Sequence, residues 1–117
     1  MEPELSSKEI HSTITGVSGV TLPVIYRDID TEDELGERHI TGVHAYCFYQ
    51  DKLLVVFSEE KGYWTPAGGG VEEGESAQDA AFREVHEESN MKVLSHRFIG
   101  YQDIIWPDHI ETQTRSV

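Results

Sequence analysis

The sequence predicts a single α/β domain, and three observations support this prediction. The length of 117 residues suits one hydrophobic core. Segments rich in β-branched and aromatic residues lie on both sides of one segment in which alanine and valine recur at helical spacing. The composition, with 38% hydrophobic and 26% charged residues, is that of an ordinary globular protein. We therefore expect strands before and after one well-defined helix.

The N-terminal third predicts a lead-in, a strand and a loop. Residues 1–19 carry few large apolar side chains and many Ser and Thr, so we expect a weakly ordered lead-in, with the domain spanning 20–117. The segment 20–26 predicts a strand, which Pro23 confines to a sheet edge or to the start of the strand. The acidic segment 28–37 is interpreted as a solvated loop, because Asp33 stands where a calcium loop needs glycine.

The middle of the chain predicts a hairpin and then a glycine loop. The segments 44–49 and 53–57 are typical of strands, and the polar residues between them predict the turn of a hairpin. A short strand is expected at 63–65. Three consecutive glycines at 68–70 then predict an irregular loop.

The remaining segments predict a helix followed by strands. Ala77, Ala80, Ala81 and Val85 recur at helical spacing, so a helix is expected over 77–88. Beyond it, residues 92–106 predict one or two strands, which end at a turn formed by Pro107 and Asp108.

Charge and hydropathy exclude several classes of function. The formal net charge of −13 repels polyanions, so no nucleic-acid partner is expected. A small phosphorylated substrate is compatible with this charge if divalent cations lie between its phosphates and the protein. No apolar run approaches the roughly 18 residues that a membrane helix needs, and the polar, acidic start is unlike a secretory signal. We therefore expect a soluble, cytoplasmic protein with no membrane partner.

The predicted helix carries the residues that indicate chemistry. Glu84, Glu87 and Glu88 stand at i, i+3 and i+4, so their carboxylates share one face, with Cβ atoms about 5 to 6 Å apart. Oxygen ligands of this kind suit Mg²⁺ or Mn²⁺. The alternative is a solvated acidic face. Two features favour function: the cluster lies near the helix C-terminus, where the helix dipole disfavours negative charge, and a glycine triplet leads into the same helix.

The stretch from Gly69 to Met91 resembles the Nudix box, a motif of the Nudix hydrolases. The residues that match its pattern are Gly69, Glu75, Arg83, Glu84, Val85, Glu87, Glu88 and Met91. Asn90 stands where the family has glycine, and asparagine is the residue that best replaces glycine in a left-handed helix end. The resemblance implies an α/β/α sandwich with a mixed β-sheet.

The resemblance also implies an activity and a set of site residues. The implied reaction is Mg²⁺-dependent hydrolysis, with Mn²⁺ as an alternative ion, of a phosphoanhydride bond in a nucleoside diphosphate linked to another moiety. Glu84, Glu87, Glu88 and the Gly69 carbonyl would hold the ions, and Glu84, Glu87 and Arg83 form the expected catalytic set, with Glu84 as the base. Arg83 would pair with Glu75, which supports the helix.

Several alternatives remain open at this point. The substrate could be a nucleoside triphosphate, a dinucleoside polyphosphate, ADP-ribose or another nucleotide sugar. The competing function is a catalytically inactive nucleotide-binding or regulatory module on the same fold. Because the family fold continues beyond the box with further strands and a second long helix, we expect a sheet that is short at its C-terminal part. Unpaired strand edges predict a homodimer or aggregation.

Overall fold

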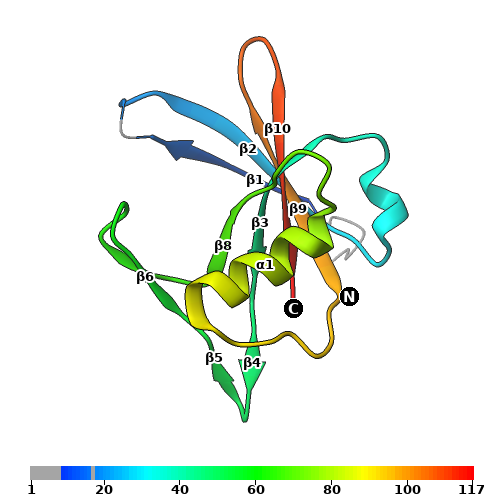
Figure 1. Cartoon of the computed structure of the whole chain (residues 1–117). Helices are drawn as coiled ribbons and strands as arrows, with labels where there is room; N and C mark the ends of the chain where they lie inside the picture. Colours follow the sequence, from blue (N-terminus) through cyan, green and yellow to red (C-terminus); the bar gives the residue numbers. More distant parts are fainter. Residues whose placement is uncertain (1–8, 17) are drawn as a thin grey trace, which may run out of the picture.

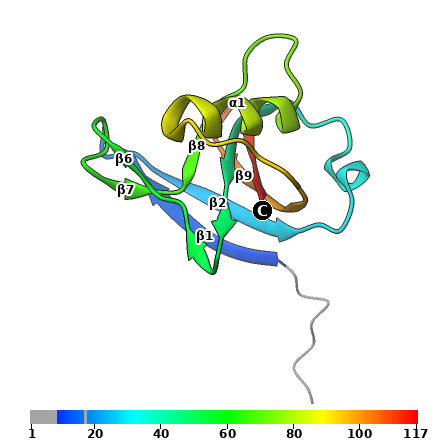
Figure 2. The same ribbon diagram turned by 60° about the horizontal axis from the view of Figure 1, so that its bottom comes forward.

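A six-stranded mixed sheet carries the α-helix α1 on one of its faces (Figures 1 and 2). The computed structural model describes residues 9–16 and 18–117. Strands β10 and β3 run parallel to each other, and every other neighbouring pair in the sheet is antiparallel. In spatial order the strands are β1 (Glu9–Thr15), β2 (Thr21–Asp28), β9 (Phe98–Ile105), β10 (Ile110–Ser116), β3 (Ile40–Ala45) and β8 (Ala67–Gly70).

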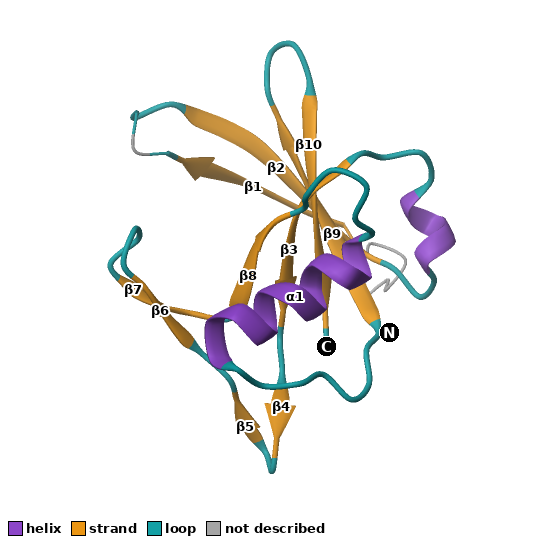
Figure 3. Ribbon diagram, viewed as in Figure 1, coloured by secondary structure: helices purple, strands orange, loops and turns teal. Residues whose placement is uncertain are grey.

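Two small hairpins and a single 3₁₀ turn extend from the sheet (Figure 3). One hairpin joins β4 (Phe48–Tyr49) to β5 (Lys52–Leu53), and its two turn residues have positive φ angles of 50° and 62°. The other joins β6 (Val56–Ser58) to β7 (Tyr63–Thr65). The 3₁₀ turn η1 covers Glu32–Leu35, within the predicted acidic loop.

The helix predicted over 77–88 is confirmed as α1, which spans Ala77–Ser89. The Ser76 hydroxyl accepts a hydrogen bond from the Asp79 backbone N–H at 3.0 Å and so caps the first turn. Ala80, Ala81 and Val85 are almost fully buried against β3 and β8, and their small side chains let the helix lie close to the sheet. This close approach brings the last two turns of α1 over the edge strand β8.

The predicted strand at 20–26 and the short strand at 63–65 are confirmed as β2 and β7, and the α/β class is confirmed. Pro23 lies near the start of β2, where it faces Thr13 of β1 and precedes the residues that pair with β9. In the described part of the chain, the only α-helical layer is the one that α1 forms.

Two predictions about local order are wrong. Residues 9–15 form the edge strand β1 instead of a weakly ordered lead-in, because seven backbone pairs with β2 hold them although their side chains are exposed. Residues 1–8 of that predicted lead-in lie outside the described residues. The glycine triplet 68–70 is not a loop: it belongs to β8, where pairing with β3 supplies the order that the residues themselves do not predict.

Predictions about pairing are corrected as well. The hairpin expected between 44–49 and 53–57 is confined to β4 and β5, while β3 pairs with β10 and β8. Residues 92–97 are not a strand, and β9 begins at Phe98. The last strand, β10, lies inside the sheet between β9 and β3 and not at an edge. That the sheet is short at its C-terminal part stays a prediction. Among the described residues no helix is long and apolar enough to cross a membrane.

Candidate active site

The three glutamates near the end of α1 lie over the edge strand β8. A Cβ atom added to Gly69 would lie 2.6 Å from the Glu84 carboxyl group, so only glycine allows this carboxylate to lie so close to the strand. The backbone N–H of Gly68 donates a hydrogen bond of 2.9 Å to Glu88 Oε1. Within the glycine triplet, Gly69 leaves room for the Glu84 carboxylate, and Gly68 donates a hydrogen bond to that of Glu88.

Arg83 joins the carboxylates of the helix to the loop that precedes it. Its Nε and Nη2 donate to the two oxygens of Glu75 at 2.8 and 2.9 Å, which is the ion pair predicted from the sequence. Its Nη1 donates to Glu84 Oε1 at 2.9 Å and to Glu87 Oε2 at 3.2 Å. Its Nη2 also donates to the Gly70 carbonyl oxygen at 2.9 Å. One guanidinium thus fixes the loop, the strand and the helix relative to one another.

The surroundings of Glu75 and Glu84 shift the pKa values of these two carboxyl groups in opposite directions. Hydrogen bonds from Arg83 and from the Glu72 backbone hold the pKa of Glu75 at about 2. Burial raises the pKa of Glu84, and the neighbouring Glu88 and Glu87 add to this effect, while Arg83 opposes it. Glu75 therefore stays ionised, and Glu84 binds a proton more readily than an ordinary glutamate.

A divalent cation suits the donor atoms of this site. As the side chains lie here, no three His, Cys, Asp or Glu residues of the described segments are arranged to hold one ion. A positive group nonetheless already lies between two of the predicted ligands, because Glu84 and Glu87 both accept from Arg83 Nη1. Side-chain oxygens, with the Gly69 backbone beside them, match the ligand preference of Mg²⁺ and Mn²⁺. The chemistry of the residues therefore fits such an ion.

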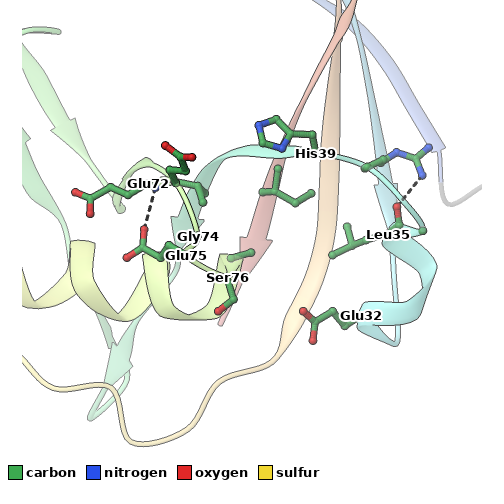
Figure 4. Close-up of a pocket in the computed structure, with 13 residues that line it drawn as sticks. Glu32, Leu35, His39, Glu72, Gly74, Glu75 and Ser76 are labelled. Atoms are coloured by element: carbon green, nitrogen blue, oxygen red, sulfur yellow. Dashed lines mark hydrogen bonds between the residues drawn. The ribbon is translucent and has the colours of Figure 1, made fainter.

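Two clefts are lined by carboxylates of this site, one by Glu75 and the other by Glu88. Figure 4 shows the first, of about 630 Å³, between η1 with His39 and the loop that holds Glu72 and Glu75. In it the Glu72 backbone N–H donates to Glu75 Oε1 at 3.0 Å. The second, of about 440 Å³, contains Glu88 together with residues of β3, β8, β10 and the β6–β7 hairpin. Among the three helix glutamates, Glu88 therefore borders open space in the second cleft.

The sequence did not identify every residue that contributes to this arrangement. Gly68 and Gly70 contribute backbone atoms, and Glu72 lies 3.8 Å from Arg83 Nη1. The glycine triplet itself was the available signal for the first two. Backbone contacts of Gly68 and Gly70 become visible only once β8 is known to lie beneath α1, which the local sequence does not predict.

Comparisons with known proteins give consistent results. The family model of the NUDIX domain matches residues 38–114. Over 68 residues the chain is 35% identical to a Bacillus subtilis (strain 168) protein named "Putative 8-oxo-dGTP diphosphatase YtkD", a match covering 58% of this chain and 42% of that protein. Over 58 residues it is 33% identical to "Uncharacterized Nudix hydrolase YvcI" of the same organism, covering 50% and 37%.

A solved structure resembles the fold. The crystal structure of a mutant of the Bacillus subtilis pyrophosphohydrolase BsRppH aligns with a TM-score of 0.68 and 21% identity. The alignment covers 90% of this chain and 63% of that one. The matches to the two sequence relatives cover less than half of each relative's length. The likeness to this solved structure shows the fold.

Proposed function

The chain belongs to the Nudix family, and from this membership together with the carboxylate cluster of α1 we propose that it is a Mg²⁺-dependent hydrolase that cleaves a phosphoanhydride bond of a nucleotide. The observation that supports this proposal most strongly is the convergence of Glu84 and Glu87 on one cationic atom, Arg83 Nη1, beside the glycine strand β8. Carboxylates that converge on a positive charge supply the oxygen donors of a divalent ion, and such an ion can bind the negative diphosphate group of a substrate.

Each residue of the site has a distinct role in the proposed reaction. Glu84, Glu87, Glu88 and the Gly69 carbonyl would hold the ions, which when bound neutralise charge on the phosphates and on the leaving oxygen. The Arg83–Glu75 ion pair orients the end of α1 against the loop. Glu84, whose carboxyl is partly buried beside Gly69, accepts the proton of the attacking water.

Nucleoside triphosphates are the first candidate substrates. The name of the relative YtkD refers to 8-oxo-dGTP, a nucleoside triphosphate, and this chain is 35% identical to it over 68 residues. Dinucleoside polyphosphates, ADP-ribose and nucleotide sugars contain the same anhydride linkage and belong in the same screen. Mn²⁺ is the natural second ion to test, because its oxygen-ligand preference resembles that of Mg²⁺.

Hydrolysis of a nucleotide panel tests the proposal. The protein is incubated with each of the four substrate classes in Mg²⁺, in Mn²⁺ and in EDTA, and the products are separated by anion-exchange chromatography. We expect release of a nucleoside monophosphate from at least one class, dependent on the metal. Nucleotide binding without turnover in either metal would instead support the inactive binding or regulatory module, and would overturn the proposed activity.

A further inference from the structure

A cleft of about 440 Å³ leads from Glu88 around the edge strand β8 to the sheet face opposite α1. Gly69 and Val43 are paired in the sheet and face α1, so their neighbours Gly68 and His44 face away from the helix. The β6–β7 hairpin, which projects beside β8 in Figure 2, supplies another wall of the cleft. The cleft therefore joins the carboxylate cluster to a separate polar surface.

The side chains that line this cleft do not suit a nucleobase. No Phe, Tyr or Trp is among the described residues that line it, so the half-buried imidazole of His44 is the one aromatic ring that these residues offer for stacking. Part of its floor is the bare backbone of Gly42, Gly68 and Gly70, and its polar groups include the amide of Gln113. A small hydrophilic group fits this lining better than a base does.

Lys61 indicates that a small hydrophilic ligand in this cleft would be negatively charged. It is the one Lys or Arg among the described residues that line the cleft, and no ion pair joins its ammonium group to another described residue. Burial lowers the pKa of His44 to about 4, and the charges of Arg115 and Lys61 contribute to this shift. The lysine charge thus acts on the interior of the cleft.

Carboxylates make that cation necessary for any anionic ligand. Glu60, Glu88 and Glu111 line the same cleft and repel an anion, and the total charge of the chain is −13. An anion that bound beyond the metal site would need the Lys61 ammonium as its counter-charge. The geometry therefore combines one unpaired cation with a polar cleft that opens onto the proposed metal ligands.

We propose that Lys61, with Gln113 in the lining of the same cleft, binds the terminal phosphate of a nucleoside triphosphate whose scissile anhydride lies at Glu84, Glu87 and Glu88. This inference rests on the proposed function, because the nucleotide is placed by that metal site. It identifies triphosphates as the preferred substrate class, since ADP-ribose and nucleotide sugars have no terminal phosphate at that position. Lys61 is thus a specificity-determining residue.

Binding of two matched analogues tests the proposal without requiring turnover. Isothermal titration calorimetry in Mg²⁺ measures the Kd of an α,β-methylene nucleoside triphosphate and of the corresponding α,β-methylene diphosphate, which lacks only the terminal phosphate. Lys61→Met should weaken binding of the triphosphate by about tenfold or more and that of the diphosphate by less than about twofold. Lys61→Arg should restore the triphosphate Kd to within about threefold of wild type.

A matched control is Lys52→Met, which removes the same charge from the exposed strand β5 of the β4–β5 hairpin and should leave both Kd values unchanged. Equal weakening of both analogues by Lys61→Met, or no weakening of either, would overturn the assignment of the subsite. If hydrolysis occurs but the Lys61 variants bind as wild type, this inference fails and the proposed function stands. If Lys61→Met weakens binding of the triphosphate alone but no substrate is hydrolysed, the phosphate subsite at Lys61 stands and the proposed hydrolysis fails.

Discussion

At the scale of single residues, the site depends on groups that act through their size or their charge alone. Gly69 matters because it has no side chain, and Arg83 matters because three carboxylates, those of Glu75, Glu84 and Glu87, accept from it. The sequence predicted Gly69, Glu75, Arg83 and the three helix glutamates, because a motif fixes their spacing. It could not predict that Lys61 and His44 line one cleft, since His44 reaches it through the pairing of β3 with β8 and Lys61 through the β6–β7 hairpin beside that strand.

Gly69→Ala should impair the reaction more than folding. The added Cβ would lie 2.6 Å from the Glu84 carboxyl group, so this flexible side chain must move away from its position over β8. Because displacements of about 1 Å can cost about a hundredfold in rate, we expect a fall in kcat of that order, measured by nucleotide hydrolysis. Gly70→Ala is the control, since its Cβ would meet no atom closer than 3.9 Å. Equal kcat values for both variants would contradict the close approach of Glu84.

Glu75→Gln should remove a pH-dependent contribution to stability. The pKa of Glu75 is held at about 2 in the folded protein, below its ordinary value of 4.5, so the unfolded chain binds more protons between these values. The contribution is complete above about pH 4.5 and is lost as the pH falls toward about 2. We therefore expect the melting temperatures of wild type and variant to differ above pH 4.5 and to converge in acid. Glu73→Gln, at an exposed position of the same loop, should show no such convergence.

At the scale of elements, the sequence predicted correctly the helix, because its hydrogen bonds and its cap lie within one short segment. The apolar spacing of α1 predicted that helix, and its bounds agree with the structure to within one residue at the C-terminal end. The sequence failed for β8 and β1, because a glycine triplet and an exposed polar segment become strands only through a partner. The position of β10 beside β3 is likewise a long-range property.

Asn90 allows a test of how α1 ends. It adopts a left-handed conformation with φ of 59°, and its N–H donates to the His86 carbonyl oxygen. Asn90→Ala should lower the free energy of unfolding by about 1 kcal/mol, because alanine is strained in this conformation, whereas Asn90→Gly should leave it level or raise it. Urea denaturation measures both values. If Ala and Gly have the same effect, the helix end does not need the left-handed residue.

At the scale of the whole molecule, contacts between distant segments complete the fold. Asp103 of β9 is 4% exposed, and its carboxylate accepts hydrogen bonds from Arg27, Arg38 and the Thr112 hydroxyl, which come from three other parts of the chain. Nothing in the local sequence distinguishes this aspartate from the many others. Such a network explains why the sequence predicted the class of the fold better than its strand order.

We still expect self-association of this 117-residue form. The edge strand β1 exposes Ile10 and Ile14, and the β4–β5 hairpin exposes Phe48 and Tyr49, each by 44% or more. Unpaired edges and apolar side chains of this kind pair readily with a second copy. Light scattering over a concentration series should show the mass of a dimer or of larger species at high concentration. A monomer at every concentration would refute this expectation.

The most direct test of the central claim is the rate of nucleoside triphosphate hydrolysis as Mg²⁺ is titrated, measured in parallel for wild type, Glu87→Gln and Asp79→Asn. Glu87 is a proposed ligand and is 55% exposed in the side chain, so its substitution should leave the melting temperature level while lowering turnover by at least about a hundredfold. Asp79→Asn removes the same charge from the first turn of α1 and should retain wild-type dependence on Mg²⁺. Full Mg²⁺-dependent activity in Glu87→Gln would contradict the assignment of the carboxylate cluster as the catalytic metal site.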